Sequence, residues 1–186
     1  MSHGSRAPPS TDRGPPGGEF ASGHIAGSTT IPAGDSVAVY TGGVLPGNTP
    51  LVLVGSDAEI GDARIHLARI GWDRIVGKIT KGLGTGGLVS HRVATFADLA
   101  AERPEAVLDV RDPLEWDSGV LGDPITIHMS AVPSRVAELP SGDVWIYCET
   151  GYRAAVAAGF VAASGRNPVV VRDDLAAVPK SSLSRN

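Results

Sequence analysis

One segment sets the order of elements in the second half of this 186-residue chain: Val144-Trp145-Ile146-Tyr147-Cys148-Glu149-Thr150-Gly151-Tyr152-Arg153. The apolar run 144–147 predicts a buried strand, Gly151 a tight loop, and the alanine-rich stretch 154–164 a helix. A strand–loop–helix unit aims successive backbone N–H groups and the positive end of the helix at one point. The only cysteine of the chain, Cys148, stands at that point.

Cys148 is therefore predicted to be a nucleophile. A thiol beside a helix N-terminus and an arginine, here Arg153, has its anion stabilised, so its pKa falls below the value of about 8.5 for a free thiol. The alternative is a buried cysteine that acts as a small hydrophobic side chain. The prediction requires amides that face the sulfur and a sulfur that is not sealed inside the core.

The composition excludes several classes of protein. Hydrophobic residues make up 42% and charged residues 19% of the chain, a balance typical of a soluble globular core. The net charge of -4 and the lack of a basic block argue against a nucleic-acid partner. No run approaches the roughly 20 apolar residues of a membrane span, and the N-terminus has no signal-peptide core. A single cysteine forms no internal disulfide, so we expect a reducing, cytoplasmic location.

Strands and helices are predicted to alternate, which favours an α/β fold with a doubly wound parallel sheet. Ligands of such sheets bind at the carboxyl ends of strands, where Cys148 lies. Asp57 and Thr95 are the predicted N-caps of two helices. The predicted strands are 51–54, 72–79, 106–110, 125–128, 144–147 and 168–171, and the predicted helices are 58–70, 96–103, 132–139 and 154–164.

Two further patterns carry no chemistry. The stretch 82–87 matches the letters of a dinucleotide-binding fingerprint, but no helix is predicted after it, so a linker is the better interpretation. The histidines are scattered without the spacing of metal ligands. We therefore expect no metal and no cofactor.

The second half resembles the rhodanese family of sulfurtransferases over roughly residues 93–178. Leu108-Asp109-Val110-Arg111-Asp112-Pro113-Leu114-Glu115-Trp116 is similar to the D-V-R-x-P-x-E-W segment of that family. The six-residue loop from Cys148 to Arg153, with cysteine first and arginine last, is the second motif. The resemblance implies a rhodanese-like doubly wound sheet and transfer of a sulfane sulfur.

The first half resembles the same family less completely. Residues 19–28 are similar to its E-F-x-x-G-H-I-x-G-S stretch, but Gly55 stands where the loop after strand 51–54 needs its cysteine. This order of an inactive and then an active repeat is similar to tandem rhodanese tails fused to metallo-β-lactamase-like persulfide dioxygenases. The chain has no H-x-H-x-D-H metal-binding segment.

The resemblance divides the chain into four parts. Residues 1–18 are predicted to be disordered, 19–80 to form a truncated and inactive repeat, 81–92 a linker, and 93–186 the catalytic domain. A repeat without its leading strand exposes a sheet edge. We therefore expect this part to pack on the second repeat, to pair with a protein partner or a second copy, or to be only marginally stable.

The resemblance also implies the roles of the site residues. Cys148 attacks thiosulfate or a persulfide and passes the sulfur to a thiol, cyanide or a protein acceptor. The donor is held by the loop residues Glu149, Thr150, Gly151, Tyr152 and Arg153. Arg153 either pairs with the donor or braces the loop, and Glu149, if it points inward, favours a neutral or cationic persulfide over thiosulfate.

The surrounding polar residues are given structural roles. Asp109 and Arg111 are expected to form a supporting ion pair. Asp112, Glu115 and Asp117 are expected to form a solvated turn.

Two other functions remain open. Departures from the family pattern at Val120, Glu149 and Asp173-Asp174 suit a rhodanese-like binding or regulatory module that turns over poorly. A cysteine phosphatase or arsenate reductase is disfavoured, because a larger tetrahedral oxyanion needs a longer loop between cysteine and arginine.

Overall fold

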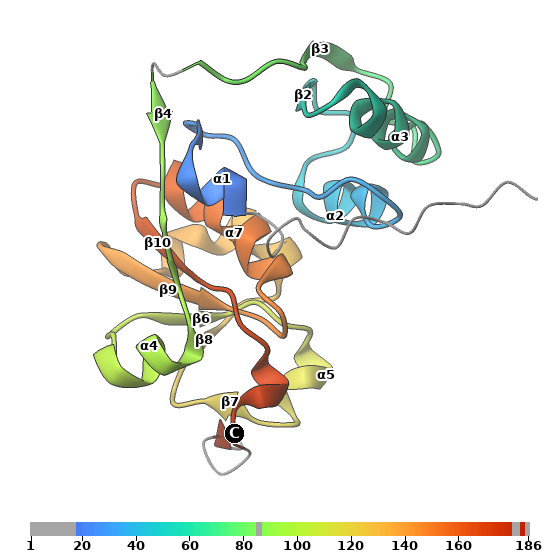
Figure 1. Cartoon of the computed structure of the whole chain (residues 1–186). Coiled ribbons are helices and arrows are strands. Elements are labelled where there is room, and N and C mark those ends of the chain that lie inside the picture. The colour runs from blue at the N-terminus through green and yellow to red at the C-terminus, as the bar shows by residue number, and fades with distance from the viewer. Residues whose placement is uncertain (1–17, 85–86, 180–182, 185–186) are drawn as a thin grey trace, which may run out of the picture.

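The computed structural model describes residues 18–84, 87–179 and 183–184 (Figure 1). The segment predicted to be disordered lies outside the described residues, except for Gly18. Within the described ranges no helix is long and apolar enough to cross a membrane.

A five-stranded sheet forms the centre of the second half. Its strand order is β5-β10-β9-β6-β8, and every neighbouring pair is parallel. The predicted doubly wound parallel sheet is thus confirmed. Its strands are β5 (Arg92–Ala94), β6 (Val107–Asp109), β8 (Ile125–Thr126), β9 (Asp143–Tyr147) and β10 (Asn167–Val171).

Side chains of β9 alternate between the two faces of this sheet. Val144 and Ile146 pack with α7 (Tyr152–Ala163) and α6 (Val132–Arg135), whereas Trp145 and Tyr147 pack with α4 (Phe96–Glu102) and η3 (Leu175–Ala177). Cys148 continues this alternation and falls on the α7 face. Helices therefore cover both faces of the sheet, and the alternation alone decides on which side the cysteine lies.

Short elements complete the second half. They are α5 (Pro113–Trp116), β7 (Val120–Leu121), η1 (Met129–Ala131), η2 (Val136–Glu138) and β11 (Leu183–Ser184), which pairs antiparallel with β7. The helix predicted at 132–139 is split between α6 and η2. Thr95 caps α4 as predicted, with a reciprocal bond from the Thr95 backbone N–H to the Asp98 carboxylate.

The first half contains smaller units. Its elements are α1 (Gly18–Ser22), β1 (His24–Ile25), α2 (Val37–Val44), β2 (Leu51–Val54), α3 (Asp57–Ala68), β3 (Ile75–Ile79) and β4 (Leu88–Val89). The strands β2 and β3 form a two-stranded parallel sheet, and β1 pairs antiparallel with β4. The predicted N-cap Asp57 is wrong by one position, because Ser56 caps α3 with Glu59 as its reciprocal partner.

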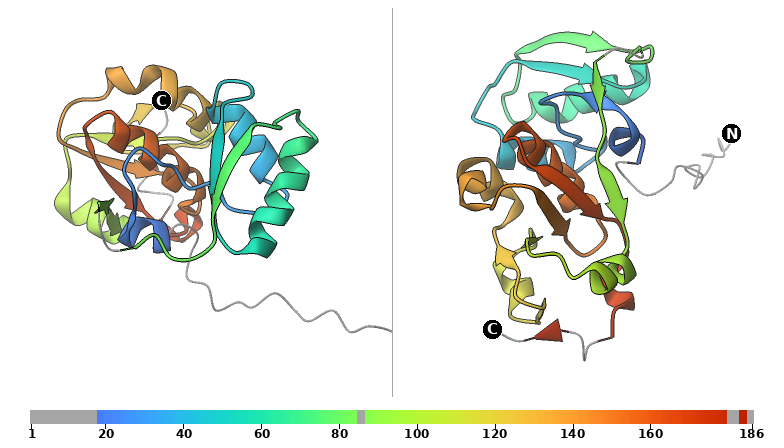
Figure 2. Two further views of the ribbon diagram at one scale, coloured as in Figure 1. Left: turned by 90° about the horizontal axis from the view of Figure 1, so that it is seen from above. Right: turned by 90° about the vertical axis from the view of Figure 1, so that its left-hand side faces the viewer.

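The segment 81–92, predicted to be a linker, contains strand residues in the part that the structure describes. Within 81–92, the segment Leu88–Val89 forms β4, and Arg92 already begins β5 at the edge of the large sheet. Figure 2 shows this stretch running down from the first half along the side of the second. The segment 81–92 therefore contributes strand residues to both halves, since β4 pairs with β1 and Arg92 begins β5.

The two halves pack tightly at α7. The Thr29 hydroxyl donates to the carbonyl oxygen of Val156 at 2.7 Å. A Cβ on Gly159 of α7 would lie 2.6 Å from the Ser28 carbonyl oxygen, so only glycine allows this approach. The strand faces of the first half are less covered, since Val52 and Val76 of β2 and β3 remain exposed.

Candidate active site

The cysteine loop joins the end of β9 to the start of α7. Gly151 is the N-cap of α7 with a φ of 83°, and no side chain caps the helix there. The first intrahelical bond runs from the Ala155 N–H to the Gly151 carbonyl oxygen at 3.0 Å. The amides of the first turn, at residues 152–154, thus have no carbonyl acceptor within the helix, as an anion-binding helix start requires.

Gly151 is required here for two reasons. Its positive φ suits glycine, and a Cβ would lie 2.9 Å from the Cα of Arg172. On the other side of the loop, the Leu175 N–H donates to the Glu149 carbonyl oxygen at 2.8 Å. Contacts with the segment after β10 therefore hold the loop in shape.

The sulfur itself is covered. Cys148 has 1% of its surface exposed and belongs to the apolar cluster beneath α7. The sulfur therefore does not meet the requirement set above, that it not be sealed inside the core, and reaction at Cys148 requires its cover to move. The next two residues, Glu149 and Thr150, are exposed, whereas Gly151 is buried.

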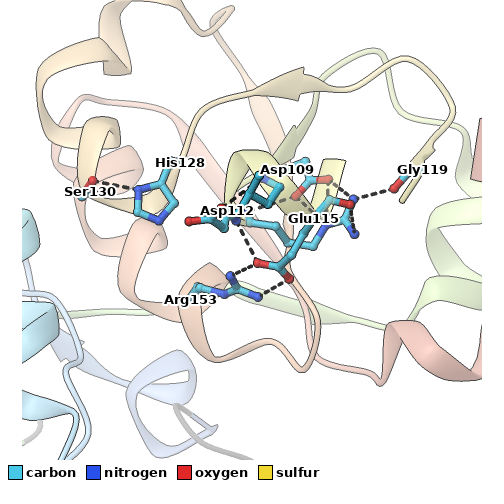
Figure 3. A network of polar contacts seen from close by, with 9 residues as sticks. Asp109, Asp112, Glu115, Gly119, His128, Ser130 and Arg153 are labelled. Carbon is cyan, nitrogen blue, oxygen red and sulfur yellow. Dashed lines mark hydrogen bonds and ion pairs between the residues drawn. The ribbon is translucent and has the colours of Figure 1, made fainter. Parts of the chain in front are cut away.

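Arg153 is held by a carboxylate. Its guanidinium grips Glu115 of α5 in a fork, in which Nη2 lies 2.8 Å from Oε1 and Nη1 bonds the second oxygen (Figure 3). The hydrogen bonds of Glu115 are the main cause that raises the pKa of Arg153, and the neighbouring Cys148 side chain raises it further. The fork between Arg153 and Glu115 favours the bracing role.

Glu115 was assigned to a solvated turn, and that prediction is wrong. Arg153 is the first cause that lowers the pKa of Glu115 to about 2, and the Asp112 backbone N–H donates to the same carboxylate at 2.9 Å. The Asp112 side chain accepts from the Leu114 N–H and caps α5. The three-residue spacing of Asp112 and Glu115 around Pro113 is a capping-box pattern, and it was the signal available in the sequence.

The neighbouring Glu149 side chain is a minor further cause that lowers the pKa of Glu115. The surroundings of Cys148 therefore contain one guanidinium and two carboxyl groups. Because the two carboxyl groups offset the charge of the guanidinium, the site has little net positive charge to attract an anionic donor.

The predicted Asp109–Arg111 ion pair is present and buried. Arg111 Nη2 lies 2.6 Å from Asp109 Oδ2, and the same guanidinium donates to the Gly119 carbonyl oxygen at 2.8 Å. Arg111 also bonds the Glu115 carbonyl oxygen at 3.4 Å. The pair ties β6 to α5 and so positions Glu115. Among the described residues, no hydrogen bond or ion pair joins Asp109 or Arg111 to Cys148.

Tyr40 of α2 was not singled out from the sequence. It packs against the apolar cluster that contains Cys148, and its ring centroid lies 5.5 Å from that of Tyr152. No local pattern marks Tyr40, because it reaches the site only through the packing of the two halves. Among the described residues no group of three or more metal-ligating side chains gathers.

Comparisons with known proteins now bear on this geometry. No family model matches the sequence. A curated protein named sulfurtransferase, from Allochromatium vinosum, is 32% identical over 83 residues, which are 44% of this chain and 72% of the relative. The chain belongs to the rhodanese-like sulfurtransferase family.

Solved structures similar to this chain include two rhodanese-like domains, each matching about half of it. A rhodanese-like domain protein from Staphylococcus aureus is 22% identical with a TM-score of 0.48, and covers 51% of this chain and 98% of its own. A rhodanese-related protein from Thermoplasma volcanium is 30% identical with a TM-score of 0.43, and covers 46% and 87%. About half of the rhodanese-like chain therefore lies outside these matches.

Proposed function

We propose that this protein transfers a sulfane sulfur through a persulfide on Cys148. The observation that carries the proposal is the position of Cys148 between the carboxyl end of β9 and the uncapped start of α7, beside the braced Arg153. Such a position stabilises a thiolate and an oxyanion or persulfide next to it. A cytoplasmic location fits a thiol that must stay reduced.

The chemistry has two half-reactions. The Cys148 thiolate attacks the outer sulfur of the donor, the S–S bond breaks, and sulfite or a thiolate leaves with the electron pair. The resulting Cys148 persulfide is then attacked at its terminal sulfur by a thiol, cyanide or a protein thiol, which regenerates the Cys148 thiolate. No outside oxidant is needed, and ping-pong kinetics are expected.

The charges around the loop favour a persulfide donor over thiosulfate. Arg153 is neutralised by Glu115, and Glu149 adds a further carboxyl group beside it. A dianion such as thiosulfate gains little from this site, whereas a neutral or cationic persulfide is not repelled. We therefore propose a low-molecular-weight or protein persulfide as the donor.

The test is mass analysis of the intact protein after incubation with an alkyl persulfide and, separately, with thiosulfate. The wild-type chain should gain one sulfur atom from the persulfide, and a thiol acceptor should remove it. Cys148→Ser should gain none and lose more than about 1,000-fold in turnover, since it lacks the nucleophile. Sulfur transfer by Cys148→Ser at the wild-type rate would refute the proposal.

Burial of the sulfur favours one second candidate. A rhodanese-like module that binds a partner and turns over poorly would also keep Cys148 at 1% exposure. A Cys148 persulfide that forms and stays, while no acceptor removes it, would support this candidate instead.

A further inference from the structure

Side chains of α2 in the first half, here called the roof, pack with the buried cluster that contains Cys148. Val44 of α2 lies in the same buried cluster as the cysteine, and Tyr40 packs against that cluster. The two residues that follow Cys148, Glu149 and Thr150, are exposed. Part of the cluster around the sulfur comes from a helix more than a hundred residues away in the chain.

The helix α2 spans the carboxyl edge of the large sheet. At one end, a Cβ on Gly43 would lie 3.7 Å from the Cβ of Ser130 in η1, the turn that follows β8. One turn earlier, Tyr40 lies against Tyr152, the first residue of α7. The two contacts place α2 beside both η1 and the start of α7, and Figure 1 shows α2 next to α7.

Tyr40 also shares its surroundings with the reacting groups. Burial is the main cause that raises the pKa of its phenol, Arg153 opposes the shift, and charge on Cys148 adds to it. The ring contact with Tyr152, four positions after Cys148, is the geometric link between Tyr40 and the cysteine loop. The Tyr40 side chain is only half-buried, so it lies on the solvent side of the roof.

We propose that Tyr40 is a specificity-determining residue of the Cys148 site and that α2 is its removable roof. The Tyr40–Tyr152 pair leaves an aromatic, poorly hydrated approach to the sulfur. A slender neutral persulfide crosses such an approach at lower cost than a tetrahedral dianion, which must give up its hydration. The donor preference rests on the proposed sulfur transfer, whereas the roof itself does not.

The test measures how fast iodoacetamide alkylates Cys148 in the full folded chain, by mass analysis of the intact protein. Tyr40→Ala should raise the rate about tenfold or more, because it weakens the closed state and enlarges the open population. Val39→Ala is the matched control, since Val39 lies on the same helix with 72% exposure. It should react at the wild-type rate, and Tyr40→Phe, which keeps the ring, should stay close to it.

A second reagent distinguishes opening of the roof from a general loss of packing in the chain. In the wild type, a bulky aryl maleimide should react with Cys148 much more slowly than iodoacetamide does. In Tyr40→Ala the ratio of the two alkylation rates should move closer to one, while thermal unfolding of the variant stays cooperative. Tyr40→Leu replaces Tyr40→Ala if the latter does not fold. It should likewise bring the alkylation rates of the two reagents closer together.

Two results would overturn the roof. One is a wild-type alkylation rate equal to that of the chain unfolded in urea, and the other is an equal rate in Tyr40→Ala and Val39→Ala. If the expected alkylation pattern appears but no persulfide forms on Cys148, the roof stands and sulfur transfer is refuted.

Discussion

Glu115 determines what charge Arg153 offers to a ligand. Because its carboxylate bonds both terminal nitrogens of the guanidinium, the fork favours a bracing role for Arg153. Glu149, directly after Cys148, adds an exposed carboxylate to the loop.

At the residue scale, Glu149→Gln should improve the use of thiosulfate. Removing one carboxylate beside the sulfur lowers the repulsion of a dianion, and we expect kcat/KM for thiosulfate to rise about three- to tenfold while that for a neutral alkyl persulfide changes little. Glu105→Gln, an exposed carboxylate before β6 at the amino edge of the sheet, is the control. An equal gain in both variants would contradict the role of Glu149.

At the scale of elements, the contact between the halves depends on one glycine of α7. The Ser28 carbonyl oxygen and Thr29 approach Gly159 so closely that a methyl group has no room, and the Thr29 hydroxyl bonds the Val156 carbonyl oxygen. The first half is therefore docked by a backbone approach and a hydrogen bond, in addition to apolar packing.

Two glycine-to-alanine changes should have opposite effects on stability. Gly159→Ala should lower the free energy of unfolding by about 1–3 kcal/mol, because the new methyl group overpacks the contact with Ser28 and Thr29. Gly61→Ala in α3 should raise it by about 0.5–1 kcal/mol, since nothing lies within 4 Å of its Cβ position and alanine favours a helix. Urea unfolding of both variants measures the difference, and a neutral Gly159→Ala would mean that this close approach does not exist.

At the scale of the whole molecule, we expect the junction of the halves to lose stability in acid. His91 lies between β4 and β5 in the chain, and the centroid of its ring is 5.5 Å from that of His24. Its backbone N–H donates to the Ala21 carbonyl oxygen at 3.0 Å. Burial is the first cause that lowers the pKa of His91 to about 4, and His24 and Arg172 lower it further. The folded chain thus keeps His91 neutral where the unfolded chain, with a pKa of 6.5, takes up a proton.

Stability should therefore fall as the pH drops below 6.5. Between about pH 7 and pH 5 we expect His91 to account for a loss on the order of 1 kcal/mol in the free energy of unfolding, and His91→Asn should flatten this part of the profile. His128→Asn, a histidine away from the junction, should keep the wild-type slope. A slope unchanged by His91→Asn, measured by urea unfolding at several pH values, would contradict the assignment.

Local patterns in the sequence were enough to predict the sheet class, the strand β9, the helix α7 and the cap of α4. Each depends on residues within a few positions of one another, as in the alternation of Val144 and Trp145 or the spacing of Thr95 and Asp98. The position of Cys148 at the carboxyl end of a strand follows from the same order of elements.

Only the tertiary structure decided what surrounds the sulfur. Arg153 and Glu115 are 38 positions apart, and Thr29 and Val156 are 127 apart, so no local spacing predicts that they meet. Tyr40 reaches the site because the first half docks on α7 and lays α2 across the carboxyl edge of the sheet. The order of elements comes from backbone geometry and side-chain periodicity, whereas the burial and charge of a site come from contacts between distant segments.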